Sequence, residues 1–349
     1  MGYIPKKTLE DLEFFKVTKQ LSSFAVTHMG KEKCVSLVPI EQSQSMHDAL
    51  RCVSEFLASF DNDNRIPNHG FEDLSSSFQL LKIENSVLEL SAFRNIAVAS
   101  ETVNNLLIFL KKFKSYYPSL YSRGSEMEVN KELKKETDNV IDRFGEIRDN
   151  ASETLYGLRK EIQSVRGKIG QSFNKALSHY HGLDFLDDIR ESVVENKRVL
   201  AVKAMYRRKV KGGILGGSKT GSIVFIEPEA THAHSRELQN LLFEESEEIK
   251  KILSQLTDFF RPHLELIKSY QTYLIEIDTF HARGRYAKEI NALLPSFSKT
   301  QELELIDAYH PLLYRTHQLE NKKTYPQDIY LKPDRRIVVI SGPNAGGKS

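Results

Sequence analysis

Apolar residues recur at steps of three and four through most of the first 117 positions, a spacing that predicts helices with one buried face. Two such runs are Leu9, Leu12, Phe15 and Leu21, and Ile83, Val87, Leu90, Phe93 and Ile96. The Asn-, Asp- and Pro-containing stretch 61–70 predicts a loop between them, and a polar linker closes this part near Gly124. Residues 1–124 are therefore expected to form a helical core.

Two longer amphipathic runs follow the core. The first begins where Asn150 and Glu153 have the spacing of a capping box, and it ends at Gly182. The second holds its apolar seam to Phe259, and Pro262 then kinks or breaks it. About thirty residues at 1.5 Å each give arms of roughly 45 Å, and the two seams predict an antiparallel pair. The alternative is a pair buried inside one globular bundle, which the charged residues flanking the seam disfavour.

The segment between these runs has the pattern of strands and a single sign of charge. Apolar stretches at 199–206 and 222–226 predict strands, with Gly pairs between them. From Asn196 to Ile226 there is no Asp or Glu. The cations of this segment are Lys197, Arg198, Lys203, Arg207, Arg208, Lys209, Lys211 and Lys219. A cluster of this kind is typical of a surface that contacts the DNA backbone, although a merely solvated hairpin is the alternative.

From Ile290 onward the pattern changes to that of an α/β nucleotide-binding domain. Strands are expected at 303–308 and 337–340, as parts of a parallel sheet. Directly after the second strand come Gly342, Pro343, Asn344, Ala345, Gly346, Gly347, Lys348 and Ser349, which match the phosphate-binding pattern G-x-x-x-x-G-K-[ST]. In such a loop the lysine holds the phosphates of ATP and the final hydroxyl ligates Mg²⁺. No Walker-B acid follows the loop, so this chain alone is not expected to hydrolyse ATP, and no catalytic residue is assigned.

Composition restricts the number of domains, the kind of ligand surface and the cellular compartment that are expected of the chain. Its 349 residues, 40% of them hydrophobic, are enough for two or three domains with real cores. The net charge of +2 means that any nucleic-acid surface must be local. Cys34 and Cys52 are the only cysteines, and their spacing argues against disulfides or a zinc site. No stretch approaches the length needed to cross a bilayer, so a cytoplasmic protein without a membrane partner is expected.

Several stretches together resemble the MutS family. The loop order G-P-N-x-G-G-K-[ST] is similar to that of this family and differs from the order in ABC-type and SMC-type ATPases. The other stretches are Leu12-Glu13-Phe14, the segment 145–152, Phe225-Ile226-Glu227-Pro228 and His310-Pro311-Leu312-Leu313. The chain most resembles the short branch that begins directly with the helical core and lacks the amino-terminal mismatch-reading domain. By this comparison it is truncated at the Walker A loop.

The expected fold is mainly α, with a helical core, long antiparallel lever helices, a small β-rich clamp at their tip, and an incomplete α/β P-loop ATPase domain. The corresponding segments are 1–124 (core), 125–195 (return to the core and ascending lever helix), 196–228 (basic clamp), 229–289 (descending lever helices) and 290–349 (start of the ATPase domain). The resemblance implies that the clamp holds mismatched or branched double-stranded DNA, and that the intact protein is a DNA-dependent ATPase. It also implies a homodimer formed through the ATPase domain, and Tyr325 stacked on adenine.

Two other functions remain open. An SMC-like chromosome-organising ATPase would also carry a coiled coil. In proteins of that kind, however, the phosphate loop is expected near the amino terminus, whereas in this chain it follows more than three hundred residues. A coiled-coil interaction module would bind no nucleic acid at all. A metal site is not expected at His179 and His181 or at His232 and His234, because residues two apart on a helix point to different faces.

Overall fold

The computed structural model describes residues 4–40 and 42–339, which form two compact units. Unit 1 consists of the described residues within Met1–Gln79, Asn95–Lys134 and His263–Ser349, and unit 2 consists of Leu80–Arg94 and Lys135–Pro262. Helices dominate both units, so the expectation of a mainly α fold is confirmed. The predicted division into five segments stays a prediction.

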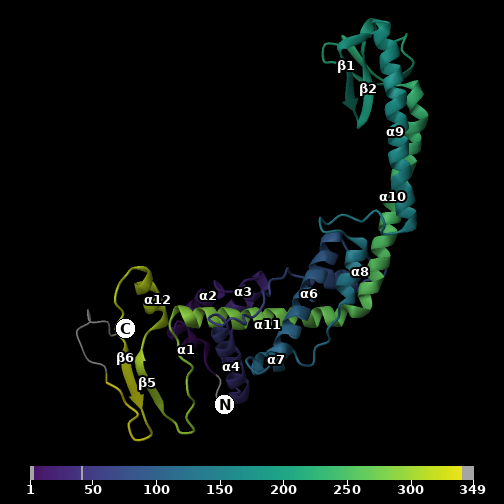
Figure 1. The fold of residues 1–349 in the computed structure, drawn as a ribbon. Coiled ribbons are helices and arrows are strands. Elements are labelled where there is room, and N and C mark those ends of the chain that lie inside the picture. The colour runs from purple at the N-terminus through teal and green to yellow at the C-terminus, as the bar shows by residue number, and fades with distance from the viewer. Residues whose placement is uncertain (1–3, 41, 340–349) are drawn as a thin grey trace. The chain divides into compact units, whose positions relative to one another are not determined.

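Unit 1 is built around one long helix, α11 (Leu264–Glu289), against which α3 and α4 pack (Figure 1). Twelve of the residues of α11 are buried, on more than one side of the helix, as expected of a helix at the centre of a core. The amino-terminal helices of the chain are α1 (Lys6–Asp11), α2 (Phe14–Ser22), α3 (His28–Val35), α4 (Ser43–Ser59), α5 (Ser75–Leu81), α6 (Leu90–Lys112), α7 (Pro118–Gly124) and α8 (Glu132–Val140). Of these, α5 and α6 belong partly to each unit, and α8 belongs mostly to unit 2.

A buried carboxylate on α11 fixes the start of α3. The oxygens of Asp278 accept hydrogen bonds from the backbone N–H of Val26 and of Thr27, both at 2.9 Å, and from Thr27 Oγ1 at 2.6 Å. Thr27 is in turn the N-cap of α3, and its hydroxyl oxygen accepts from the Gly30 N–H. Burial alone would raise the pKa of Asp278, but its hydrogen bonds outweigh that effect and hold the pKa at about 2.

Unit 2 contains two long helices that run side by side, α9 (Glu153–Gly182) and α10 (Glu229–Phe260) (Figure 1). The predicted end of α9 at Gly182 is confirmed, and a 3-10 turn around Pro262 follows α10 as the proline predicts. The predicted capping residue is wrong, because Ser152 and not Asn150 is the N-cap. Its hydroxyl oxygen accepts a hydrogen bond from the Leu155 N–H at 3.0 Å.

The apolar seam between α9 and α10 continues well beyond their base. At the base, Leu155 and Ile252 share a cluster with Ile147. The next cluster contains residues of α9 and α10 only, with Ile162, Val165 and Leu241 at its centre. The two helices therefore form this middle stretch by packing on each other, which favours the extended pair over a globular bundle.

A four-stranded antiparallel sheet lies at one end of this pair, in the order β1-β2-β4-β3. Its strands are β1 (Leu186–Val194), β2 (Lys197–Lys203), β3 (Gly212–Gly217) and β4 (Ile223–Pro228). Phe173 of α9 packs against Leu200, Val202 and Ile226, so the helix supplies one side of the core of the sheet. The predicted strand at 199–206 ends early, because a 3-10 turn occupies Ala204–Tyr206.

Strand β1 lies outside the segment predicted to be β-rich, which was expected to begin at Asn196. It joins β2 through a two-residue loop in which Glu195 and Asn196 both have positive φ, 50° and 60°. This is the backbone of a type I′ turn, whose twist matches that of the flanking strands. The predicted boundary at 195/196 therefore falls inside a hairpin loop.

The last elements of unit 1 are β5 (Leu303–Ala308), α12 (Pro311–Leu319) and β6 (Gln327–Leu331). The bounds of β5 are as predicted, but the parallel sheet is not found among the described residues, because β5 and β6 pair antiparallel. The strand predicted at 337–340 is also wrong over its described part, since Ile337 and Val339 are exposed and have no strand partner there. The loop Gly342–Ser349 lies outside the described residues.

Two Gly-to-Ala substitutions in unit 2 should change stability in opposite directions. A Cβ at Gly212 would lie 2.0 Å from the Glu227 carbonyl oxygen, whereas a Cβ at Gly167 would meet nothing within 4 Å. Gly212→Ala should destabilise unit 2 by about 1–3 kcal/mol, because the β3 and β4 backbones must separate. Gly167→Ala, inside α9, should stabilise it by about 0.5–1 kcal/mol. Denaturant titration monitored by circular dichroism measures both, and equal effects would contradict the close approach of the strands.

Candidate nucleic-acid interface

The sheet of unit 2 and its connecting loops carry all eight cations predicted to contact DNA, but three of them already have acidic partners. Lys197 Nζ lies 2.9 Å from Glu227 Oε2, and Lys203 Nζ lies 2.9 Å from Asp184 Oδ1. Arg198 donates to Glu191, and its guanidinium also lies over the Phe173 ring, 4.2 Å from the centroid. These three side chains hold the sheet together, so they are less available to a ligand than the sequence suggested.

Glu227 is the most buried of these acids, with only 5% of its surface exposed. It accepts hydrogen bonds from Lys197 on β2 and from Ser235 Oγ on α10, and so links the sheet to that helix. Burial alone would raise the pKa of Glu227, but the hydrogen bonds from Lys197 and Ser235 outweigh it and the pKa is lowered. The carboxylate is therefore ionised at neutral pH.

The other five cations are exposed and form no salt bridge within the described part of the chain. They are Arg207, Arg208, Lys209, Lys211 and Lys219. Four of them belong to one short loop, between the 3-10 turn Ala204–Tyr206 and β3, and Lys219 lies in the turn between β3 and β4. We call these five residues the basic loop set. Their charges are unneutralised and close together in the chain, which is the arrangement that attracts a polyanion.

The charged residues of segment 196–226 are all positive, but the sheet as a whole contains both signs of charge because β1 contributes acids. Asp184, Asp187, Asp188 and Glu191 lie on or next to β1, the strand that the sequence analysis missed. Two of these acids neutralise cations of β2. The positive charge therefore concentrates at the loops, where no acid of the described chain is paired with it.

Aromatic rings support the loop 207–211, which carries four members of the basic loop set. The Phe185 and Tyr206 rings stack with centroids 4.6 Å apart and an interplanar angle of 22°. The Lys209 ammonium lies 5.6 Å from the Tyr206 centroid and 5.7 Å from that of Phe185. The backbone N–H of Lys211 donates to the Tyr180 hydroxyl at 3.1 Å. The loop is thus attached to α9 and the sheet at several points, which limits the entropy it would lose on binding a ligand.

The predicted nucleotide site cannot be assembled from the described residues. Tyr325, the predicted adenine platform, is 70% exposed in the loop before β6. The Lys323 ammonium lies 5.0 Å from its ring centroid. Its predicted partners, including Lys348 and Ser349, are outside the described part of the chain. The nucleotide and magnesium assignments stay predictions.

Within residues 4–40 and 42–339, one group of side chains has the composition of a metal site, and it was not predicted. It consists of His69, Asp278 and His281 in unit 1, whereas the two histidine pairs considered from the sequence belong to no such group. No described helix combines the length and apolar character that a bilayer crossing requires.

The chain is similar to curated proteins named Endonuclease MutS2. It is 27% identical over 345 residues to that of Geobacillus sp. (strain WCH70), 28% over 347 residues to that of Bacillus velezensis, and 29% over 346 residues to that of Lactobacillus helveticus. These alignments cover 98–99% of this chain but only 43% of each relative, so the chain spans less than half of their length. No protein-family model matches it. The similarities support a relationship to MutS proteins.

Removing a paired cation and an unpaired one should affect stability differently. Lys197→Met leaves the buried Glu227 without its charged partner and should destabilise unit 2 by about 1–3 kcal/mol at pH 7. Lys219→Met should change stability by less than about 0.5 kcal/mol, because Lys219 is exposed and has no acidic partner in the described structure. Denaturant titration of the two variants makes the comparison.

The loss of unfolding free energy in Lys197→Met, relative to Lys219→Met, should also depend on pH. The pKa of Glu227 is lowered from its ordinary value of 4.5, so its contribution to stability is present above that value and is lost as the pH falls through the folded-state pKa. The two variants should therefore converge in stability on acidification. A deficit that stays constant from pH 7 to pH 3 would contradict the Lys197–Glu227 pairing.

Proposed function

We propose that this chain is the DNA-contacting part of a MutS-like protein that clamps mismatched or branched duplex DNA. The observation that carries the proposal is the basic loop set, five exposed cations without acidic partners in the described structure, at the end of a paired-helix arm. The names of the relatives support an association with nucleic acid, since each is called an endonuclease.

The chemistry of the basic loop set favours contact with phosphates over contact with base edges. Lysine and arginine on a short exposed loop neutralise backbone charge and release counterions, which gives affinity without reading a sequence. A ligand recognised in this way is distinguished by its shape. We therefore expect discrimination between linear, mismatched and branched duplexes, in which phosphates have different spatial arrangements.

We propose further that the loop 342–349 binds the triphosphate of ATP, with Lys348 on the phosphates and Ser349 on Mg²⁺. In this proposal ATP binding closes a homodimer through the nucleotide-binding domain, and the helices transmit that change to the basic loop set. The complete pattern of eight residues supports the assignment. The position of Tyr325 before β6 supports a role in contacting adenine.

Removing three charges of the basic loop set should weaken DNA binding. Replacing Arg207, Arg208 and Lys209 by Ala should lower the affinity for duplex DNA at least about 10-fold at 0.1 M salt. It should also reduce the slope of log K against log salt by about 2–3, close to one unit for each phosphate contact removed. Fluorescence anisotropy with linear, mismatched and four-way-junction DNA over a range of salt concentrations measures both quantities.

The matched control removes the same charge elsewhere. Lys111, Lys112 and Lys114 are exposed cations of unit 1 without a salt bridge in the described structure. Their replacement by Ala should leave the slope within about 0.5 of the wild-type value. If both triple variants lose affinity equally, binding follows net charge alone. If neither does, the chain is an interaction module without a nucleic-acid surface on this sheet.

The nucleotide proposal separates into a phosphate part and a base part. Lys348→Ala should weaken the binding of both Mg·ATP and Mg·tripolyphosphate about 10-fold or more, because it removes the charge that meets the phosphates. Tyr325→Ala should weaken the binding of ATP only, because tripolyphosphate has no base to stack. Isothermal titration calorimetry measures the four affinities. Equal loss of both ligands in Tyr325→Ala would exclude adenine stacking, and an unchanged Lys348→Ala would exclude the loop.

A further inference from the structure

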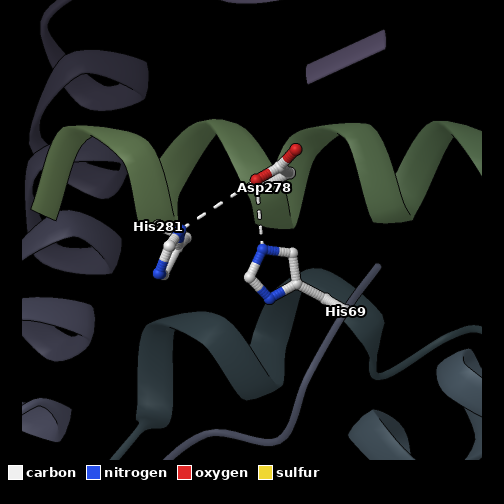
Figure 2. Close-up of side chains that lie close together, drawn as sticks. All are labelled: His69, Asp278 and His281. Atoms are coloured by element: carbon white, nitrogen blue, oxygen red, sulfur yellow. Dashed lines mark hydrogen bonds and ion pairs between the residues drawn. The ribbon is translucent and has the colours of Figure 1, made fainter. Parts of the chain in front are cut away.

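Three side chains of types that can ligate a metal, from distant parts of the sequence, meet in the core of unit 1 (Figure 2). Asp278 and His281 lie one turn apart on α11, and His69 comes from the loop before α5. Their ligand atoms all lie within 4.8 Å of one another. Asp278 is fully buried and His69 is 4% exposed, so this is not a chance cluster of surface charges.

We propose that His69, Asp278 and His281 form a binding site for a transition-metal dication, with Zn²⁺ as the preferred ion. Two imidazoles and one carboxylate are a ligand set typical of Zn²⁺ and its neighbours in the first transition row, whereas Mg²⁺ and Ca²⁺ prefer oxygen ligands. The site shares no residue with the basic loop set or with the loop 342–349, so it extends the proposed function without depending on it.

The distances are close to those of a preformed site. His69 Nε2 lies 3.1 Å from Asp278 Oδ1, and His281 Nδ1 lies 4.0 Å from the same oxygen. Ligand atoms around a tetrahedral Zn²⁺ are about 3.3 Å apart, given bonds of about 2.0–2.1 Å. The three ligand atoms lie within 4.8 Å of one another, so reaching that spacing needs side-chain movements of up to about 1.5 Å, which changes of rotamer angle can provide.

The hydrogen bonds of the ligands fit the proposal. His281 Nδ1 is buried and has no hydrogen-bond partner in the described structure, a state that costs free energy and that a ligand would relieve. Asp278 Oδ2 accepts from the Thr27 backbone N–H and Oγ1, and Oδ1 accepts from the Val26 N–H, so the carboxylate is held in place while Oδ1 also faces both histidines. The hydrogen bond from His69 to Oδ1 would be replaced by two metal bonds, one to Nε2 and one to Oδ1, and the neutral imidazole would then carry its proton on Nδ1.

A cavity of about 240 Å³ borders both histidines and leaves room for a fourth ligand. The Phe56 and Phe60 rings form T-shaped pairs with the His281 ring, so part of the wall is apolar. Arg65 and Arg285 line the same cavity. Their positive charge opposes the metal, and a dication with one carboxylate would leave the site with excess positive charge. The fourth ligand is therefore expected to be an anion or a hydroxide.

Metal titration of the whole chain without a polyhistidine tag tests the proposal. Calorimetry with Zn²⁺ should show one ion per chain, Mg²⁺ should not bind there, and Co²⁺ should give the visible absorption of a tetrahedral complex. His281→Phe keeps an aromatic ring beside Phe56 and removes Nε2 together with Nδ1, of which Nδ1 is buried without a hydrogen-bond partner in the described structure, so the fold should be retained. The affinity for Zn²⁺ should fall about 100-fold in this variant, and Zn²⁺ should no longer raise its melting temperature.

Two further variants make the outcome decisive. His69→Gln retains an amide donor toward Asp278 and should lose Zn²⁺ binding as His281→Phe does. His28→Ala removes an exposed histidine whose side chain is 81% accessible and should bind Zn²⁺ as the wild type does. The proposal is overturned if the wild type binds no ion stoichiometrically, if His281→Phe binds as tightly as the wild type, or if His28→Ala loses the ion.

Discussion

The apolar seam between α9 and α10 is the interaction on which the position of the sheet in unit 2 depends. It begins with Leu155 and Ile252, continues through Ile162 and Leu241, and ends where Phe173 packs under the sheet. Each fully buried aliphatic or aromatic side chain contributes about 1.5–3 kcal/mol. Because the middle cluster contains residues of these two helices alone, no third element can compensate for a shortened side chain there.

Charge in the sheet is organised by pairing across strands. Cations on β2 face acids on β1 or near its ends, and Glu227 connects β2 to α10 through Lys197 and Ser235. Cations on the loops have no such neighbours in the described structure. The sheet itself is therefore close to neutral, while its loops are strongly positive. A charge count along the sequence cannot separate these two groups, because the acids that make the distinction lie outside the basic segment.

Periodicity predicted the helices well and the strands unevenly. The stop at Gly182, the break at Pro262 and the bounds of β5 follow from local signals, namely the end of an apolar repeat, a missing N–H and an apolar alternation. Strand β1 was not predicted, because Asp187, Asp188 and Arg190 give its sequence the polar character of a linker. Edge strands often carry charged residues of this kind. The antiparallel pairing of β5 with β6 could not be foreseen, since strand direction depends on which partner is available.

The contacts that assemble functional groups were the least predictable. His69 and Asp278 are separated by 209 positions, and no local pattern marks either as the partner of the other. The same holds for Glu227, which the sequence placed only within a family-like stretch. For the basic cations, the sequence identified the cluster, and the structure separated those with acidic partners from those without, while their contact with DNA stays a prediction.

The connectivity of unit 2 makes the sheet a self-contained insertion. Gly182 ends α9 four residues before β1 begins, and Pro228 ends β4 directly before α10. The two junctions between the sheet and the helices, α9 to β1 and β4 to α10, therefore lie at the same end of the hairpin formed by α9 and α10. A cassette attached in this way can be exchanged, enlarged or shortened between related proteins without rethreading the remaining chain, because only two adjacent junctions have to be preserved. The inserted sheet can thus diversify in evolution while the helical scaffold beneath it is retained.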